Sequence, residues 1–535
     1  MALPGIDGVW SARPRTGAAV ALGVLATLLG VAALLLLAPP AGERLLGGRA
    51  WLVGPLRIGV PLVLLALWIV ILLRHDAHRL AAALGLGAAC FLVYERLTLP
   101  AAENVSANAA YVPAALRLVR GGEPTVATAP ARPAPVTARE TPRRASAAPR
   151  DSPRRTPAPS IGAHVTTSPD ATEPTVQGST EASASVAGIA VAIAPFAWLA
   201  DGVLDGSIPP PRRWERVADA VADALGAITV ALLFVAARRL GAEPRLALCG
   251  ALVLAFCTPH LSLHAGGLWS HNVSAALWAA ALVLALPGGG EPMAAGAAWS
   301  GALAGLATLA RPGALALTLL PLVIVGARRR AAALFWLLPF VLVIGLAVLS
   351  SPGSLRSSLA ALLPSHLLAA LGTPSLVRWG RAAWGLLVSP NRGLLVFCPL
   401  LVFAVGGAGL GIAVSDGWKR RFYVAAALCS IATVAIAAGN PRWWDGAGYG
   451  PRHLADLLPL LALLLLPVVQ WLLGAPSWSR IAGSGLLVLA LTASAVVAWR
   501  GATAPATREW NVNPPASEAR AWDWSDLQAL RRSER

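Results

Sequence analysis

The chain has 535 residues, of which 56% are hydrophobic and only 13% are charged, and its mean hydropathy is +0.64. Soluble domains carry about 25% charged residues, so this composition excludes a water-soluble globular protein. A net charge of +17 would suggest a nucleic-acid partner in a soluble protein. Here the arginines stand in short runs between apolar stretches, which indicates membrane orientation instead, and we expect no nucleic-acid partner.

Apolar residues recur in stretches that are long enough for membrane-spanning helices. A helix needs about 20 apolar residues to cross about 30 Å of hydrocarbon. The sequence therefore predicts an all-α integral membrane protein, a bundle of 13 transmembrane helices. We expect the spans at 17–38, 57–73, 80–99, 217–237, 246–263, 271–287, 293–310, 311–327, 331–350, 393–414, 421–438, 454–474 and 480–499.

The basic loops predict the orientation of the bundle, because short loops rich in Arg and Lys stay in the cytoplasm. Such loops occur at 74–79, 238–245, 328–330 and 415–421. All of them are cytoplasmic if the N-terminus is inside and the apolar stretch 186–204 does not cross. We therefore interpret 186–204 as an interfacial or re-entrant helix and place the C-terminus outside. A single lysine and an excess of Ala, Arg, Gly and Pro are typical of a GC-rich bacterial genome, so we expect a bacterial inner membrane protein.

This topology divides the chain into five parts. Residues 1–99 hold the first three transmembrane helices, and 100–185 form a large outer loop. Within that loop, the Pro/Ala/Arg-rich segment 123–175 cannot bury enough apolar area to offset its conformational entropy, so we expect it to be disordered. After the interfacial helix, 205–499 complete the bundle. The polar tail, 500–535, contains three tryptophans and is expected to pack on the outer surface.

Polar and aromatic residues of unusual type gather at the predicted outer ends of the helices. Charged residues and histidines at membrane depth are costly, and they are usually functional or paired. Arginines at outer helix ends require a negative partner, and the phosphate of a lipid carrier would supply one, since guanidinium binds its oxygens bidentately. The residues at these outer ends are Glu103, Trp269, His271, Arg311, Asn391, Arg392, Trp444, Asp445, Tyr449, Arg452 and His453.

Structural interpretations of the same residues stay open. Arg311 precedes a proline and could snorkel to the interface, and Trp444 could belong to an interfacial aromatic belt. Asp445 and Arg452 could form a structural ion pair. The histidines at 260, 264 and 271 resemble a metal site, but no carboxylate residue lies between them in the sequence. We expect no cofactor, with a divalent metal as the alternative.

Several motifs resemble a known group when they are taken together and in order. They are Thr258-Pro-His-Leu-Ser-Leu-His-Ala-Gly-Gly-Leu-Trp-Ser-His271, Leu309-Ala-Arg-Pro312, Ser389-Pro-Asn-Arg-Gly393, Trp443-Trp-Asp-Gly-Ala-Gly-Tyr-Gly-Pro-Arg-His453 and the tail tryptophans. Over 186–535 the chain resembles a large group of uncharacterised bacterial polytopic membrane proteins. That group is similar to the GT-C glycosyltransferases, which include the protein O-mannosyltransferase and aminoarabinose-transferase families.

The resemblance implies a GT-C-like bundle with a large first outer loop. It also implies a glycosyltransferase that moves a sugar from a polyprenyl-phosphate donor to an envelope glycan, lipid or protein acceptor at the outer face. An acidic residue early in the first outer loop acts as general base in such enzymes. The family usually has an Asp there, and this chain has Glu103.

The resemblance also suggests roles for the outer residues. Glu103 and Asp445 would be catalytic, and Arg311, Arg392 and Arg452 would bind the donor phosphate. The cavity would be lined by Trp269, His271, Asn391, Trp444, Tyr449 and His453. The alternatives are a non-catalytic GT-C-like protein of envelope assembly, and a transporter or flippase for lipid-linked sugars. A transporter would favour inverted repeats and charge at the membrane midplane, whereas this chain has its charges at the outer ends.

Overall fold

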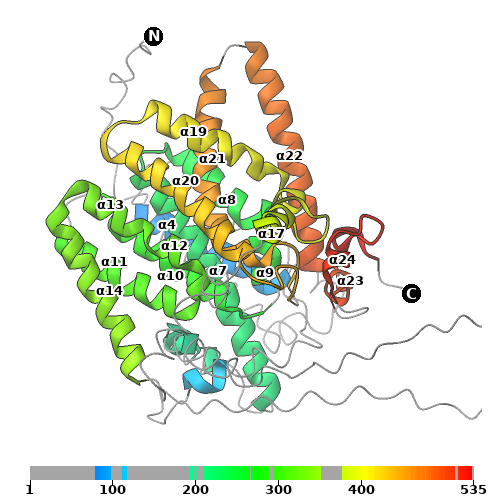
Figure 1. The fold of residues 1–535 in the computed structure, drawn as a ribbon, viewed down its shortest axis with the longest axis horizontal. Coiled ribbons are helices and arrows are strands. Elements are labelled where there is room, and N and C mark those ends of the chain that lie inside the picture. The colour runs from blue at the N-terminus through cyan, green and yellow to red at the C-terminus, as the bar shows by residue number, and fades with distance from the viewer. Residues whose placement is uncertain are drawn as a thin grey trace, which may run out of the picture.

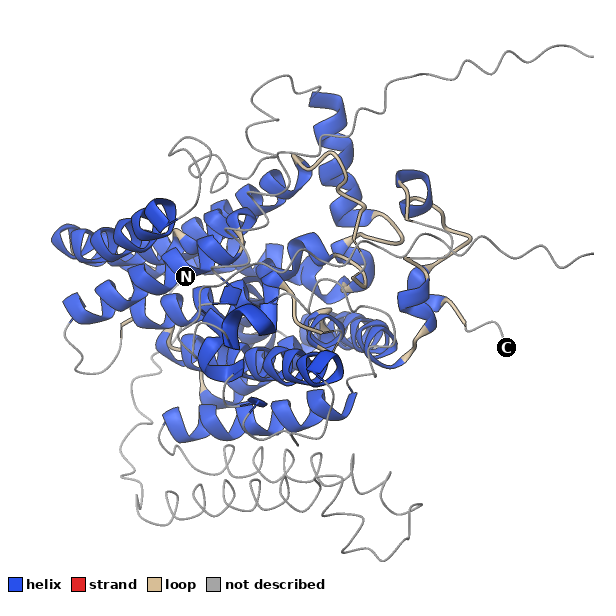
Figure 2. Ribbon diagram, turned by 90° about the horizontal axis from the view of Figure 1, so that it is seen from below, coloured by secondary structure: helices blue, strands red, loops and turns tan. Residues whose placement is uncertain are grey.

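A computed structural model gives the fold. It describes residues 79–97, 111–116, 189–201 except 191, 198 and 199, 210–287 except 266, 293–350, 376–511 except 447 and 476, and 516–532. Within these ranges the chain is helical and no strand occurs. The helices pack side by side as a bundle (Figure 1), and most loop residues lie on the side that carries the C-terminus (Figure 2).

Several apolar helices fit a multi-pass membrane protein. Five are long and apolar enough to span a membrane: Arg213–Arg239, Arg330–Ala347, Gly417–Ala438, Arg452–Gly474 and Trp478–Thr503. Shorter apolar helices are Ala83–Glu95, Pro244–Cys257, Ser270–Ala285, Ala294–Ala310, Pro312–Arg328 and Pro399–Val414. The predicted spans 17–38 and 57–73 lie outside the described residues, so the number of 13 spans stays a prediction.

The elements appear in the following order. The first half holds α4 (Arg79–Leu97), α7 (Pro210–Arg239), α8 (Pro244–Cys257), α9 (His260–His264), α10 (Ser270–Ala285), α11 (Met293–Ala310), η1 (Pro312–Ala314), α12 (Leu315–Thr318), α13 (Leu320–Arg328) and α14 (Arg330–Ser350). The second half holds α17 (Leu376–Val388), α18 (Leu394–Phe397), η2 (Pro399–Leu401), α19 (Val402–Val414), α20 (Gly417–Ala438), η3 (Arg452–Leu457), α21 (Leu458–Gly474), α22 (Ser477–Thr503), α23 (Ala506–Glu509), α24 (Glu518–Ala521) and η4 (Gln528–Leu530).

Prolines break three of the apolar stretches that the sequence predicts as single helices. The span predicted at 246–263 divides into α8 and α9 at Pro259. The one predicted at 311–327 divides into η1, α12 and α13, and the one at 393–414 divides into α18, η2 and α19. Proline lacks the N–H that an inner helix position donates, and its ring clashes with the preceding turn. The helix breaks at these prolines are therefore local, and the next helical segment begins within a few residues of each break.

The stretch 186–204 is helical over 189–190, 192–197 and 200–201. Ile189 and Ile193 are fully buried in a cluster that includes Val217 and Val221 from the first half of α7. Asp201 also accepts a hydrogen bond of 2.6 Å from Arg213 in α7. This stretch therefore packs along α7. The predicted disordered segment 123–175 lies outside the described residues.

Three of the four predicted cytoplasmic basic clusters, at 238–245, 328–330 and 415–421, lie together at one end of the bundle. Arg239, at the end of α7, donates a hydrogen bond of 2.6 Å to the carbonyl oxygen of Val283 near the end of α10. Arg328, at the end of α13, lies 3.5 Å from the carbonyl oxygen of Ala285. Arg421, near the start of α20, donates to the carbonyl oxygen of Ala327 at 3.0 Å. These contacts connect the ends of four helices, and we call this region the arginine end.

Close helix packing depends on small residues, as is common between membrane helices. The Cα of Gly301 in α11 faces the backbone of Trp336 in α14, and the Trp336 ring nitrogen donates to Ser300 at 3.1 Å. The Cα of Gly407 in α19 likewise lies against the carbonyl oxygen of Leu464 in α21. Large apolar side chains on the outside of the bundle are exposed, which is expected for surfaces that contact lipid.

The glycine contact between α19 and α21 gives a stability prediction. A Cβ on Gly407 would overlap the carbonyl oxygen of Leu464, whereas a Cβ on Gly409 meets nothing within 4 Å. Gly407→Ala should therefore lower the free energy of unfolding by about 1–3 kcal/mol. Gly409→Ala should be neutral or stabilising because alanine favours the helix by about 0.5–1 kcal/mol. Thermal unfolding in detergent measures both, and equal effects would contradict the packing.

The topology predicts which end of the bundle is accessible from outside the cell. In a background with the five native cysteines changed to alanine, we expect Arg442→Cys to react with an impermeant maleimide in intact cells. Arg329→Cys, at the arginine end, should react only after permeabilisation. Both arginines are exposed in the fold, so accessibility depends on the membrane side. The reverse labelling pattern would overturn the predicted orientation.

Candidate functional site

Five of the side chains at the other end of the bundle form one group, which we call the α10–η3 cluster. It consists of Trp269, His271, Arg311, Arg452 and Asp456. Trp269 is the N-cap of α10, His271 lies in its first turn, and Arg311 lies between α11 and η1. Arg452 and Asp456 belong to η3. Because α10 has 16 residues, a rise of 1.5 Å per residue separates this cluster from the arginine end by about 24 Å.

Arg311 turns into the protein because α11 ends just before it. Pro312 follows, and Arg311 itself adopts an extended backbone with φ −154° and ψ 96°. Its Nη1 lies 2.6 Å from Oδ2 of Asp456, and its Nη2 donates to the carbonyl oxygen of His453 at 3.2 Å. The Asp456 side chain is only 3% exposed. Arg311 is therefore held in a buried ion pair, and the snorkelling interpretation is wrong.

Arg452 lies over the ring of Trp269, with the guanidinium carbon 4.9 Å from the ring centroid. Among the described residues, no hydrogen-bond acceptor or carboxylate pairs with this guanidinium. The Trp269 ring also stacks on His271, with centroids 6.3 Å apart and planes 9° apart. The His271 Nε2 is buried and has no hydrogen-bond partner in the described part of the chain. The Arg452 guanidinium and the His271 Nε2, which both lie beside Trp269, thus have no hydrogen-bond acceptor among the described residues.

The turn at Gly446 lies between the guanidinium groups of Arg452 and Arg392 and contacts both of them. The Gly446 carbonyl oxygen accepts a hydrogen bond of 3.2 Å from Arg392 Nη2. On its other side, a Cβ at this position would lie 2.8 Å from Arg452 Nη1. Gly446 also has φ +116°, a conformation that glycine adopts most readily. The two guanidinium groups are therefore brought close to each other by a turn that requires glycine.

These contacts leave an excess of positive charge at this end of the bundle. Arg311 has Asp456 as its counter-ion. Neither Arg392 nor Arg452 has a carboxylate within 4.0 Å among the residues described, although both are largely removed from water. A charge that is buried without a counter-ion is costly, so an anion would be bound favourably here.

Arg392 has a different environment from Arg452, because the protein satisfies its guanidinium completely. Its Nε donates to the carbonyl oxygen of Trp444 at 2.8 Å. Its Nη1 donates to the Asn391 carbonyl oxygen and to Gln528 Oε1, and its Nη2 to the Gly446 carbonyl oxygen and Asn511 Oδ1. A guanidinium has five N–H donors, so none remains for a phosphate. The predicted phosphate contact of Arg392 would require one of these bonds to break, and we assign this arginine to positioning the tail.

Burial shifts the protonation equilibrium of Arg392. Loss of hydration, followed by the charge of the nearby Arg452, lowers the pKa of Arg392 to about 9. The group therefore stays charged at neutral pH. Its acceptors are all uncharged, so the positive charge is solvated by dipoles without being neutralised. It adds to the positive potential that reaches Arg452.

Two of the other predicted residues hold the C-terminal segment or α22 in place. The Asn391 amide donates to the carbonyl oxygens of Arg520 and Asp523, and its Oδ1 accepts from the Gln528 backbone at 2.6 Å. Tyr449 donates to the carbonyl oxygen of Val497 in α22 at 2.9 Å, and burial raises its pKa. The Asn391 contacts join the described part of the tail to the turn at 389–393, while the predicted outer location of the tail stays a prediction. Asn391 and Tyr449 thus have protein partners, and their predicted place in the cavity lining stays a prediction.

The remaining predicted residues surround the cluster from the 440–453 loop. The Asp445 side chain is 52% exposed and lies 3.8 Å from Arg442. A structural ion pair between Asp445 and Arg452 was one interpretation, and no such pair forms. Trp444 packs edge-on against Trp443 and is partly buried. His453 Nε2 donates to the carbonyl oxygen of Asp445 at 3.1 Å.

Glu103 lies outside the described residues. In the described ranges, no group of three His, Cys, Asp or Glu side chains could hold a metal ion. His260 and His264 form a ring pair 4.0 Å apart, and each has a carbonyl oxygen of α7 as its partner, from Gly226 and Ala222 respectively. Gly226 allows this contact, because a Cβ there would lie 2.7 Å from the His264 ring. These two histidines therefore pack α9 against α7.

The sequence interpretation did not single out Asp456, Gln528 or Asn511. Asp456 stands at the third position of the predicted span 454–474. A carboxylate inside an apolar span is costly and signals a partner, so this position could have been found. Gln528 and Asn511 lie in the tail without any such signal, and only the fold places them beside Arg392.

Comparisons with protein-family models, with curated proteins and with solved structures find no match to this chain. The resemblance to GT-C glycosyltransferases therefore stays a prediction that rests on the motifs of the sequence.

The network around Arg392 predicts that the tail depends on this one side chain. Arg392→Met should leave several buried acceptors without donors, at a cost of about 1–3 kcal/mol for each. We expect a lower unfolding temperature in detergent and faster protease cleavage within 516–532. The control is Arg442→Met, because Arg442 has a side chain that is 75% exposed. An unchanged cleavage rate in Arg392→Met would contradict the proposed anchoring.

Proposed function

We propose that the chain is a membrane glycosyltransferase that binds the phosphate of a polyprenyl-phosphate-linked sugar at the α10–η3 cluster. It would transfer the sugar to an envelope glycan, lipid or protein on the outer side of a bacterial inner membrane. One observation carries the proposal. The Arg452 guanidinium is stacked on Trp269 and has no hydrogen-bond acceptor among the described residues, and the Nε2 of His271 beside it also lacks a partner.

The chemistry of the cluster suits a phosphate. A guanidinium can donate two parallel hydrogen bonds to phosphate oxygens, and stacking on Trp269 fixes the plane of Arg452 in advance. His271 can donate a further hydrogen bond from Nε2. Arg311 is neutralised by Asp456, so it orients η3 relative to α11 and adds little charge. The polyprenyl chain would extend from the cluster into the surrounding lipid.

Such a site would favour transfer because negative charge develops on the phosphate as it leaves. The bond between the sugar C1 and the phosphate oxygen breaks, and an acceptor hydroxyl oxygen forms a new bond to C1. The hydroxyl proton passes to a carboxylate, and polyprenyl phosphate is released. Donors that are already fixed around the leaving phosphate stabilise this charge. The carboxylates proposed for the proton are Glu103 and Asp445.

A second candidate function is binding of the lipid carrier without transfer. One observation favours it. The carboxylate within the α10–η3 cluster belongs to Asp456, and it is committed to Arg311. A cluster without a free carboxylate could hold the carrier for another protein of envelope assembly. The two functions differ in whether Glu103 or Asp445 reaches the acceptor.

Binding of polyprenyl phosphate to the purified protein tests the site. Loss of a charged contact to a buried phosphate costs about 2–5 kcal/mol, so Arg452→Ala should weaken binding at least tenfold. Arg452→Lys should restore only part of it because lysine cannot bind bidentately. Arg442→Ala, in the exposed part of the same loop, should bind like wild type. Normal binding by Arg452→Ala would show that the site is elsewhere.

Transfer is tested separately with Glu103→Gln, which should keep carrier binding and lose sugar transfer from a polyprenyl-phosphate donor. Full activity of this variant would indicate Asp445 as the base, and Asp445→Asn would then abolish transfer. If wild type binds the carrier but transfers no sugar from any donor, the non-catalytic function is the correct one.

A further inference from the structure

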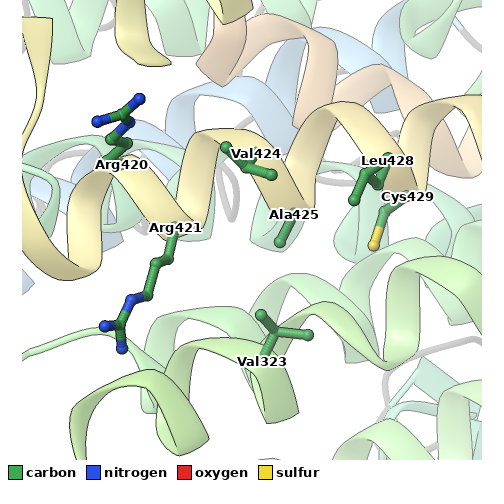
Figure 3. Close-up of a pocket in the computed structure, with 7 residues that line it drawn as sticks. All are labelled: Val323, Arg420, Arg421, Val424, Ala425, Leu428 and Cys429. Carbon is green, nitrogen blue, oxygen red and sulfur yellow. The ribbon is translucent and has the colours of Figure 1, made fainter. Parts of the chain in front are cut away.

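A groove lies between α13 and α20, close to the arginine end and remote from the α10–η3 cluster. Its volume is about 420 Å³, within the range of small-molecule sites. The walls are almost entirely apolar, and Figure 3 shows Val323 on α13 facing the row of side chains on α20. The row consists of Arg420, Arg421, Val424, Ala425, Leu428 and Cys429.

The groove opens to the outside of the bundle. Val323 is 45% exposed and Leu428 is 60% exposed. Both belong to helices in apolar spans, so in a membrane this surface contacts lipid. Hydrocarbon would fill the groove, and its apolar walls are suited to one acyl chain.

Basic residues at one end of the groove distinguish it from an ordinary lipid-facing surface. The start of α20 carries Arg420 and Arg421, and the end of α13 is followed by Arg329 and Arg330. Arg421 ties the two helix ends through its bond to the carbonyl oxygen of Ala327. The guanidinium groups of Arg420, Arg329 and Arg330 are exposed, and no carboxylate in the described part of the chain pairs with them.

A second groove on the same protein has no arginine among its lining residues. It lies between α11 and α14, has a volume of about 550 Å³ and is lined only by apolar residues, including Phe335 and Leu338. Both grooves can accept hydrocarbon, but of the two only the α13–α20 groove has arginines, Arg420 and Arg421, among the residues that line it. The comparison separates the effect of charge from that of apolar contact.

We propose that the α13–α20 groove binds an anionic phospholipid. One acyl chain lies along Val323, Val424 and Leu428, and the phosphate is held by Arg420 together with Arg329 and Arg330. A guanidinium and a phosphate match in charge and geometry, and anionic lipids are attracted by basic residues at the membrane surface. This site is independent of the carrier site at the opposite end of the bundle.

Native mass spectrometry of the full-length protein tests the site, with phosphatidylglycerol and phosphatidylcholine of identical acyl chains as probes. We expect wild type to retain phosphatidylglycerol at least tenfold more strongly. Arg420→Gln should reduce that preference at least threefold, and Arg420→Lys should keep most of it. Leu428→Trp should lower retention of both lipids by filling the groove. Equal retention of both lipids by wild type would overturn the proposal.

Matched variants keep the result specific. Arg442→Gln, at the other end of the bundle, and Leu338→Trp, in the α11–α14 groove, should leave the preference for phosphatidylglycerol unchanged. A loss of preference in Leu338→Trp equal to that in Arg420→Gln would contradict the location. Thermal unfolding in detergent confirms that each variant folds. Crosslinking by a phosphatidylglycerol with a photoreactive acyl chain should modify residues on α13 and α20, and labelling confined to other helices would also refute the site.

Discussion

The hydrogen bonds of Arg392 are the constraint on which the end of the bundle with the α10–η3 cluster depends. One guanidinium joins the turn at 389–393, the loop at 440–453 and the C-terminal segment, which are distant in the sequence. Burying it requires an acceptor for every N–H, because an unsatisfied buried donor is costly. Five acceptors from these three segments must therefore be in place at once, and this fixes the course of the 440–453 loop.

The position of Arg452 follows from that loop. Gly446 bonds to Arg392 on one side and leaves room for Arg452 on the other, while Arg311 and Asp456 hold η3 against the end of α11. The protein thus satisfies one arginine with dipoles, pairs a second with a carboxylate and leaves a third on the face of Trp269. This division explains why three arginines that look equivalent in the sequence have different chemistry.

Arginines at the two ends of the bundle act in different ways. At the arginine end they donate to carbonyl oxygens at the ends of α10 and α13, which complements the negative end of a helix dipole. Arg420, Arg329 and Arg330 remain exposed there. At the α10–η3 cluster the arginines are enclosed by protein, so their charge is screened little by water. The first arrangement suits lipid head groups, and the second suits a single bound anion.

The sequence by itself determined the all-helical, membrane-type architecture, because apolar stretches of helix length and a lack of charge leave no other way to satisfy the backbone in lipid. It also indicated Trp269, His271, Arg311 and Arg452, which the fold brings together, because polar groups at helix ends stand out against apolar spans. Only the tertiary structure decided the role of each. Asp456 pairs with Arg311, and Gln528 and Asn511 satisfy Arg392, through contacts across up to 145 positions of sequence. No local pattern encodes such partners, since they depend on how the helices pack.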